Sequence, residues 1–182
     1  RSLPLVGTLR AAIRQPAYAL GGVLLRRGCK VHLATGDPVR VHPAFVGWSL
    51  EQYEPELMRW LTSTLRPGDS FLDVGAHVGF FSLLASRLVG AGRVVAIEAS
   101  PPTAKLLQRH LAMNRAANVS VIAALASSRE GEGEIAVRAN PTDPGACANS
   151  IAYRIPGGRS VRVPIVTLDR VAAKFEIAPR VI

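Results

Sequence analysis

Two acidic residues, each at the end of an apolar segment, flank a glycine-containing turn near the middle of this 182-residue chain. Asp73 lies near the end of segment 70–74, and Glu98 directly follows segment 93–97. Between them lies the turn Gly75-Ala76-His77-Val78-Gly79, followed by a helix-like run. If both segments are parallel strands, the two carboxylates reach the same edge of a sheet, beside a turn whose backbone can approach a ligand closely. The pattern therefore predicts a site for a nucleoside-like ligand at that edge.

The residues of the turn narrow the choice of ligand. The G-x-G-x-x-G fingerprint of dinucleotide sites would need glycine near position 77 and Gly or Ala at position 80, where this chain has His77 and Phe80. These side chains prevent the close approach that a pyrophosphate requires, which disfavours an NAD-linked oxidoreductase. S-adenosylmethionine has no pyrophosphate, and it carries an ammonium group that can face Asp73 and ribose hydroxyls that can donate to Glu98. Taken singly, Asp73 could instead cap the following turn and Glu98 could be a solvated strand end. Both acids in this order favour S-adenosylmethionine as the cofactor.

The elements around the turn alternate between strand and helix patterns. Segments 70–74, 93–97 and 119–125 are expected to be strands, and segments 80–88 and 101–114 to be helices, the second opened by Pro101-Pro102. This alternation predicts right-handed crossovers and an α/β fold, with a parallel sheet and helices on both faces. Further helices are expected over 51–65, with Leu57, Trp60, Leu61 and Leu65 at helical spacing, and over 167–175. Further strands are expected over 30–33, 39–41, 132–139, 161–166 and 180–182, with a loop over 140–159.

The predicted domain organisation is a helical, basic extension over residues 1–40, followed by one domain over residues 41–182. The net charge of +9 is uneven, with +6 in residues 1–50, −1 in 51–135 and +4 in 136–182. Basic flanks of this kind either form a solvated surface or attract an anionic partner such as nucleic acid, a membrane surface or a phosphorylated substrate. The apolar segment 17–25 is too short to span a bilayer and is expected to pack on the domain, with an interfacial anchor as the alternative. The two cysteines, Cys29 and Cys147, are far apart in sequence and have no metal-site spacing, and a disulfide between them stays open. We expect a cytoplasmic protein. No His, Asp and Glu cluster has metal-ligand spacing, so the sequence assigns no metal site and gives no support for metal dependence.

Four segments together resemble one enzyme class. They are LRPGDSFLDVGAHVGFFSLLAS (65–86), GRVVAIEASPPTAKLLQRHLAMN (92–114), NVSVIAALASSREGEGEI (118–135) and VPIVTLDRV (163–171). The chain resembles the class I S-adenosylmethionine-dependent methyltransferases, and more narrowly the FkbM family, over residues 40–182. The resemblance implies a Rossmann-like methyltransferase sheet that lacks its C-terminal strands here. It also implies O-methylation of a hydroxyl on a small molecule, a lipid or a glycan.

The resemblance also assigns parts of the cofactor to individual residues. It implies that Gly75, Ala76, His77, Val78 and Gly79 form the turn at the methionine end, which Asp73 supports. It implies that Glu98 binds the ribose, that Ala99 and Ser100 flank the adenine, and that Leu125 lies near the adenine edge. The third strand carries no acid for the adenine amino group, so backbone groups or Ser127 would have to serve.

No catalytic residue follows from the sequence. An alcohol acceptor can require a general base, for which His77 is best placed, although a histidine that is merely packed or exposed in the loop is the simpler interpretation. His32 and His42 could approach the acceptor, whereas His110, on a helix face, is expected to be exposed. Two other functions stay open: a nucleic-acid methyltransferase of the same fold, and a non-catalytic S-adenosylmethionine-binding fragment.

Overall fold

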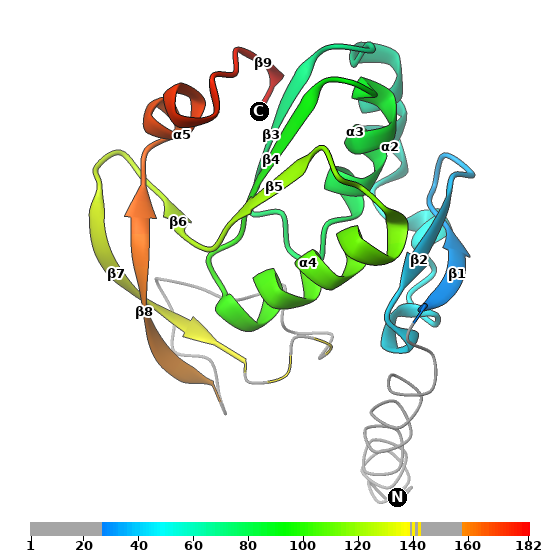
Figure 1. Ribbon diagram of the computed structural model, residues 1–182. Coiled ribbons are helices and arrows are strands. Elements are labelled where there is room, and N and C mark those ends of the chain that lie inside the picture. Colours follow the sequence, from blue (N-terminus) through cyan, green and yellow to red (C-terminus); the bar gives the residue numbers. More distant parts are fainter. Residues whose placement is uncertain (1–26, 139, 141, 143–157) are drawn as a thin grey trace, which may run out of the picture.

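The computed structural model describes residues 27–138, 140, 142 and 158–182, and the described elements form three sheets and four α-helices (Figure 1). An antiparallel hairpin, β1 (Cys29–His32) and β2 (Pro38–Val41), precedes the main sheet. The main sheet has the order β5-β4-β3-β9, and a smaller sheet has the order β6-β8-β7. Residues 1–26 of the expected N-terminal extension, with its apolar segment 17–25, lie outside the described residues.

All neighbouring strands of the main sheet are parallel: β3 (Ser70–Val74), β4 (Arg93–Ile97), β5 (Val119–Ile122) and β9 (Pro179–Val181). Helix α3 (Phe80–Val89) connects β3 to β4, and α4 (Pro101–Asn114) connects β4 to β5. The bounds of β3, β4 and α4 are those expected from the sequence. Because the apolar runs of β3 and β4 are buried on both faces, they form the centre of the sheet.

Helices cover both faces of this sheet, and alternate residues of β3 show the two sides. Phe71 packs in a cluster with residues of α2 (Pro55–Thr64), α3, α4 and the hairpin. Leu72 packs on the other side with Val95, Ile97 and Val171 of α5 (Leu168–Phe175). The α/β class with a parallel sheet and helices on both faces is therefore confirmed.

The expected third strand, 119–125, is divided between two sheets. Pairing with β4 ends at Ile122, and after a turn β6 (Leu125–Ala126) pairs with β8 (Arg159–Val166). β7 (Gly131–Val137) completes that sheet on the other side of β8, in antiparallel orientation. In the sequence the two strands form one apolar run. The strand that each half pairs with depends on distant segments, so the sequence does not show the division.

The helix expected over 51–65 begins only at Pro55. Residues 43–45 and 50–52 form single 3₁₀ turns, η1 (Pro43–Phe45) and η2 (Leu50–Gln52), and Glu54 is left-handed, so the proline takes the first helical position. The expected apolar face was partly wrong, because Leu57 and Trp60 are exposed. The buried side chains are Met58, Leu61 and Leu65.

The hairpin β1–β2 packs against the C-terminal half of α4 (Figure 1). Val39 and Val41 are buried in the same cluster as Leu107 and Leu111 of α4. Asn114 fixes the pairing, since its side chain accepts from the Arg40 backbone N–H at 2.8 Å and donates to the Arg40 carbonyl at 2.7 Å.

Candidate functional site

Asp73 lies at the carboxyl edge of β3 and is almost fully buried. Its carboxylate accepts hydrogen bonds from the hydroxyl of Ser82, at 2.5 Å, and from the Ser82 backbone N–H. Burial raises the pKa of Asp73 to about 6, the two bonds from Ser82 oppose the rise, and the charge of Glu98 adds to it. Because Ser82 is the third residue of α3, Asp73 satisfies an N–H group at the start of that helix. The capping alternative for Asp73 is thus realised, beside the charge of a second carboxylate.

Glu98 follows the last residue of β4, and its side chain is 8% exposed. One carboxylate oxygen accepts from the His77 backbone N–H at 2.9 Å, and the other accepts from the Ser100 backbone N–H at 2.8 Å. Burial raises the pKa of this carboxyl group, and the same two bonds oppose the rise. Glu98 is therefore not a solvated strand end but a fixed carboxylate between the turn and the start of α4.

The two glycines of the turn have different surroundings. Gly75 has a φ of 75°, and a Cβ at this position would meet nothing within 4 Å. Gly79 has a φ of 89°, and a Cβ there would lie 2.1 Å from Cδ1 of Leu107 in α4. Gly75 therefore leaves open space beside the turn, whereas Gly79 allows α3 and α4 to pack closely.

The turn folds over the end of β4. The backbone N–H groups of Gly75 and Ala76 both donate to the Ile97 carbonyl, at 2.9 and 3.0 Å. Gly79 in turn donates to the Ala76 carbonyl at 2.8 Å. These bonds hold the turn beside the Glu98 carboxylate.

His77 occupies a left-handed conformation, with a φ of 51°, that is uncommon outside glycine. Its ring is stacked on Trp48, with centroids 6.4 Å apart, and its Nε2 is buried without a hydrogen-bond partner among the described residues. Burial lowers the pKa of His77, so the imidazole is neutral at pH 7. The turn thus carries one buried, unpaired polar atom.

The expectation that His110 is exposed was wrong, since its side chain is fully buried in α4. Its Nδ1 lies 2.9 Å from the Val78 carbonyl, and its Nε2 accepts from the His42 backbone N–H at 2.9 Å. The acceptor role of Nε2 requires the proton to be on Nδ1, so His110 is neutral and donates to Val78. Burial lowers the pKa of His110 to about 4. The side chain therefore links the turn to the hairpin, through contacts far apart in the sequence.

The remaining predicted residues lie at the start of α4 and on the small sheet. Ser100 is fully buried, and its hydroxyl accepts from Thr103 at 2.9 Å. Ala99 and Leu125 are partly buried and pack against the same apolar cluster, which consists of Ile135, Val137 and Val163. The structure thus brings Ala99 and Leu125 to one apolar surface, next to the fixed Glu98.

These groups fit the parts of S-adenosylmethionine. A carboxylate has about four lone-pair positions, of which the two N–H donors occupy two at Glu98, so two stay for the hydroxyls of a ribose. Asp73 is a carboxyl group that a neighbouring ammonium would keep ionised. Open space at Gly75 and the unpaired Nε2 of His77 lie on the turn between them. Within the described part of the chain, no group of three or more His, Cys, Asp or Glu residues is arranged to hold a metal ion, and no helix is long and apolar enough to cross a membrane.

A parallel sheet in which β3 leads through a glycine-containing turn into α3, with carboxylates at the ends of β3 and β4, defines a class I methyltransferase fold. The chain belongs to the TRM5/TYW2 methyltransferase domain family, whose model matches residues 30–139. The match confirms the expected resemblance to the class I methyltransferases, and the cofactor of that class is S-adenosylmethionine. The match is to this family, and membership of the FkbM family stays a prediction.

Similar proteins include ribosomal protein L11 methyltransferases. That of Symbiobacterium thermophilum is 30% identical over 101 residues, which are 55% of this chain and 33% of the relative. That of Burkholderia pseudomallei strain K96243 is 37% identical over 59 residues, which are 32% of this chain and 19% of the relative. The chain thus spans a third or less of the length of these relatives.

Solved structures give partial overlays. M. jannaschii TYW2 in complex with AdoMet has 23% sequence identity and a TM-score of 0.39, and the overlay covers 48% of this chain and 39% of that chain. Precorrin-6y C5,15-methyltransferase from Geobacter metallireducens has 27% identity and a TM-score of 0.37, covering 40% of this chain and 39% of that chain.

Proposed function

We propose that this chain binds S-adenosylmethionine across the carboxyl ends of β3 and β4 and transfers its methyl group to an acceptor. The observation that carries the proposal is the fixed carboxylate of Glu98, which two backbone N–H groups hold at the end of β4 with two lone-pair positions still unused. Vicinal ribose hydroxyls are the donors that suit such a carboxylate. The bound cofactor would supply an activated sulfonium methyl group.

At the other end of the site, Asp73 supplies negative charge for an ammonium group. Gly75, together with the backbone of Ala76, Val78 and Gly79, lets that part of the ligand approach the turn. At neutral pH a carboxyl group with a pKa of about 6 is mostly ionised, so the charge is available without a further proton loss. Ala99 and Leu125 offer an apolar surface for the adenine beside Ser100.

We propose that the neutral imidazole of His77 forms a hydrogen bond with the bound cofactor or acceptor. Its Nε2 is buried and unpaired, and leaving such an atom without a partner costs about 1–3 kcal/mol. A ligand group that pairs with it removes this cost. For a hydroxyl acceptor the same nitrogen can accept the proton, because burial keeps the ring neutral.

The acceptor that the comparisons support is a macromolecule. The matching family carries the names TRM5 and TYW2, and the curated relatives include ribosomal protein L11 methyltransferases. These names favour a nucleic-acid or protein acceptor over the hydroxyl of a small molecule, lipid or glycan that the FkbM resemblance implied. We therefore place nucleic acid and protein first as acceptor classes.

Calorimetric titration of purified protein with S-adenosylmethionine tests the proposal. Glu98→Ala should weaken binding at least tenfold, about 1.4 kcal/mol, because the ribose loses its acceptor. Since the variant also removes two contacts to the backbone, its circular dichroism spectrum and melting temperature are measured first. Glu132→Ala is the matched control, because it removes a carboxylate that is exposed on β7.

Affinity that is unchanged in a folded Glu98→Ala protein would remove Glu98 from the ribose role. Formation of S-adenosylhomocysteine in the presence of RNA, ribosomal protein or small hydroxyl compounds then separates the acceptor classes. Cofactor binding without turnover on any of them would favour the non-catalytic alternative.

A further inference from the structure

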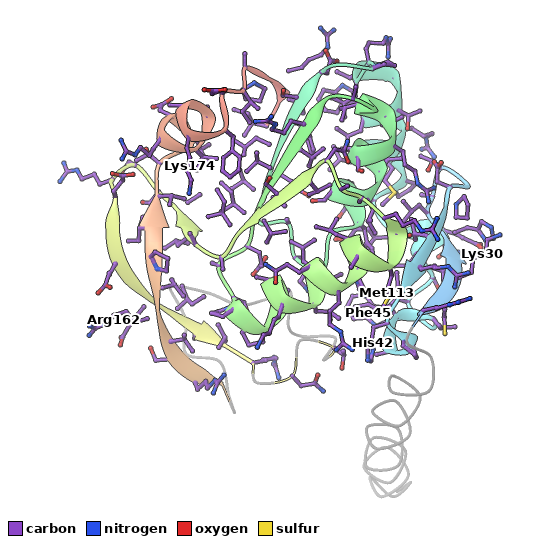
Figure 2. All side chains as sticks on the ribbon, viewed as in Figure 1. Lys30, His42, Phe45, Met113, Arg162 and Lys174 are labelled. Carbon is purple, nitrogen blue, oxygen red and sulfur yellow. The ribbon has the colours of Figure 1, made fainter. Side chains whose placement is uncertain are left out.

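A second site candidate lies at the other end of α4, away from the carboxyl edge of the sheet. A cavity of about 870 Å³ lies between the hairpin and the C-terminal half of α4, with a contribution from α3. Figure 2 labels Lys30 on the hairpin and Met113 on α4, two of the residues that line this cavity. We call this cavity the basic groove, because six cationic residues line it: Arg27, Lys30, Arg40, Arg87, Arg109 and Arg115.

Among the described residues that line the basic groove, none is acidic. Two of its cations have partners within the described chain. Arg87 pairs with Asp37 at 3.6 Å and donates to the Pro38 carbonyl, and Arg40 donates to the carbonyls of Arg27 and Gly28 at 3.3 Å each. Four exposed cationic side chains, those of Arg27, Lys30, Arg109 and Arg115, have neither an ion pair nor a hydrogen bond to any described residue.

This concentration of charge exceeds what the helix end requires. A basic residue near a helix C-terminus is favourable because it faces the negative end of the helix dipole, and Arg115 directly after α4 fulfils that role. Lys30 and Arg27 come from the hairpin side, so the dipole of α4 does not account for their positions. Cations gathered from separate elements repel one another, and an anionic ligand removes that repulsion.

The frame of the basic groove is fixed by hydrogen bonds. Asn114 binds both the N–H and the carbonyl of Arg40, so the hairpin cannot slide along α4 without breaking two bonds of 2.7 and 2.8 Å. Met113 packs closely under Gly28, where an added Cβ would lie 2.7 Å from its sulfur. The cations therefore project from a firm base rather than from a free strand.

The chemistry of the lining favours phosphate. Five of the six cations are arginines, whose planar guanidinium groups bind phosphate oxygens in a bidentate manner. They come from three elements around an open groove, which suits a ligand with repeated charges better than a single small anion. Helix α4 has 14 residues, so the two ends of the helix, one at Ser100 beside Glu98 and one at the basic groove, are about 20 Å apart. Phosphates on one strand of a duplex recur every ~3.4 Å, so about six nucleotides cover that distance.

We propose that the basic groove binds the sugar–phosphate backbone of a nucleic acid. The proposal that the basic groove binds nucleic acid rests only on the residues that line it. That the bound strand is the methyl acceptor, held about 20 Å from the end of α4 beside Glu98, rests on the function proposed above.

The test measures binding of fluorescent 20-nucleotide RNA and DNA oligomers by anisotropy at several salt concentrations. The groove variant is Arg109→Glu with Arg115→Glu, whose side chains have no partner to lose in the described chain. The control is Arg162→Glu with Arg170→Glu, which has the same change in net charge at two side chains that are each 73% exposed on β8 and α5. A milder variant, Lys30→Ala with Arg109→Ala, replaces the first if charge reversal prevents folding.

We expect the groove variant to bind at least tenfold more weakly than the wild type at low salt. The slope of log K against log salt should fall by about 0.7 to 0.9 for each phosphate that the variant no longer neutralises. The control should keep most of its affinity and its slope. Binding of S-adenosylmethionine, measured in the same proteins, should be unchanged in both, so that a failure of the groove is distinguished from a failure of the cofactor site.

Three results would overturn the proposal. The first is equal loss of affinity in the groove and control variants, which would mean that only net charge matters. The second is displacement of the oligomer by inorganic phosphate at a similar concentration of phosphate groups, which would indicate a small-anion site. The third is a wild-type protein that binds anionic phosphatidylserine vesicles but neither oligomer, together with loss of vesicle binding in the groove variant.

Discussion

Replacing His110 by alanine should destabilise the protein strongly, although the residue lies outside the set predicted to bind the cofactor. The side chain joins the turn to the hairpin through the Val78 carbonyl and the His42 N–H, both at 2.9 Å. Its ring also contacts Phe45 edge-on, with centroids 5.5 Å apart, and stacks on Phe80 at 6.4 Å. Removing it leaves the buried Val78 carbonyl and the partly buried His42 N–H without this partner, and a cavity between aromatic rings.

The magnitude follows from these contacts. Each unsatisfied buried group costs about 1–3 kcal/mol, so the two cost about 2–6 kcal/mol, and we expect a loss of roughly 3–5 kcal/mol in the free energy of unfolding. For a chain of this size, about 2–4 °C of melting temperature corresponds to 1 kcal/mol, so the melting temperature should fall by about 6–20 °C. Urea unfolding followed by circular dichroism measures the loss. His32→Ala is the control, because His32 is exposed on the hairpin and its removal should change stability by less than about 0.5 kcal/mol.

The pH dependence gives a second readout of the same variant. The pKa of His110 in the folded protein is about 4, below its ordinary value of 6.5, so the unfolded chain binds more protons between these values. Its contribution to stability is therefore complete above pH 6.5 and is lost as the pH falls toward 4, by up to about 1.4 kcal/mol per pH unit. Electrostatic interactions with His42, Arg109 and His77 lower the pKa of His110 further.

Asp73 has the opposite effect. The pKa of Asp73 in the folded protein, about 6, lies above the ordinary value of 3.8, so the folded state binds more protons between these values. The contribution of Asp73 to stability therefore rises as the pH falls from about 6 to 3.8. Because the wild type contains both effects, the useful quantity is the stability difference between wild type and His110→Ala. That difference should narrow from pH 7 to pH 4. A loss below about 1 kcal/mol at pH 7, or a difference that does not vary with pH, would refute the proposed role of His110.

The turn and its carboxylate give further predictions. Gly75→Ala should cost about 1 kcal/mol of backbone strain at its positive φ but leave the fold intact, because a Cβ there meets open space. The added methyl group should weaken S-adenosylmethionine binding severalfold. Unchanged affinity by calorimetry would place the ligand elsewhere. Gly79→Ala should instead reduce the melting temperature by several degrees, because its Cβ would collide with Leu107, and equal melting of the two variants would contradict the different roles of these glycines. The affinity for S-adenosylmethionine should fall by up to tenfold per pH unit below pH 6, because Asp73 takes up a proton there. The Asp73→Asn variant should bind S-adenosylmethionine weakly at every pH. A wild-type affinity that does not change with pH would show that Asp73 does not pair with the ammonium group.

The sequence determined the central elements around the site. The bounds of β3, β4 and α4 follow from local signals: uninterrupted apolar runs, a turn with glycine at both ends, and two prolines that open a helix. Their alternation also predicted a parallel sheet, and hence that Asp73 and Glu98 would reach the same edge. Each of these signals acts within a few residues, so no knowledge of distant contacts was required.

Only the tertiary structure decided which side chains are buried, paired or left free. The sequence predicted that His110 is an exposed helix residue. In the fold its two ring nitrogens bond to Val78 and His42, which lie 32 and 68 residues away in the sequence. The division of segment 119–125 depends in the same way on β8, which follows it by more than thirty residues. The basic groove joins arginines that are scattered along the chain, and only the packing of the hairpin on α4 turns them into one surface. Hydrogen-bond pairing and electrostatic fields depend on distances in space, and the chain sets those distances only when it folds.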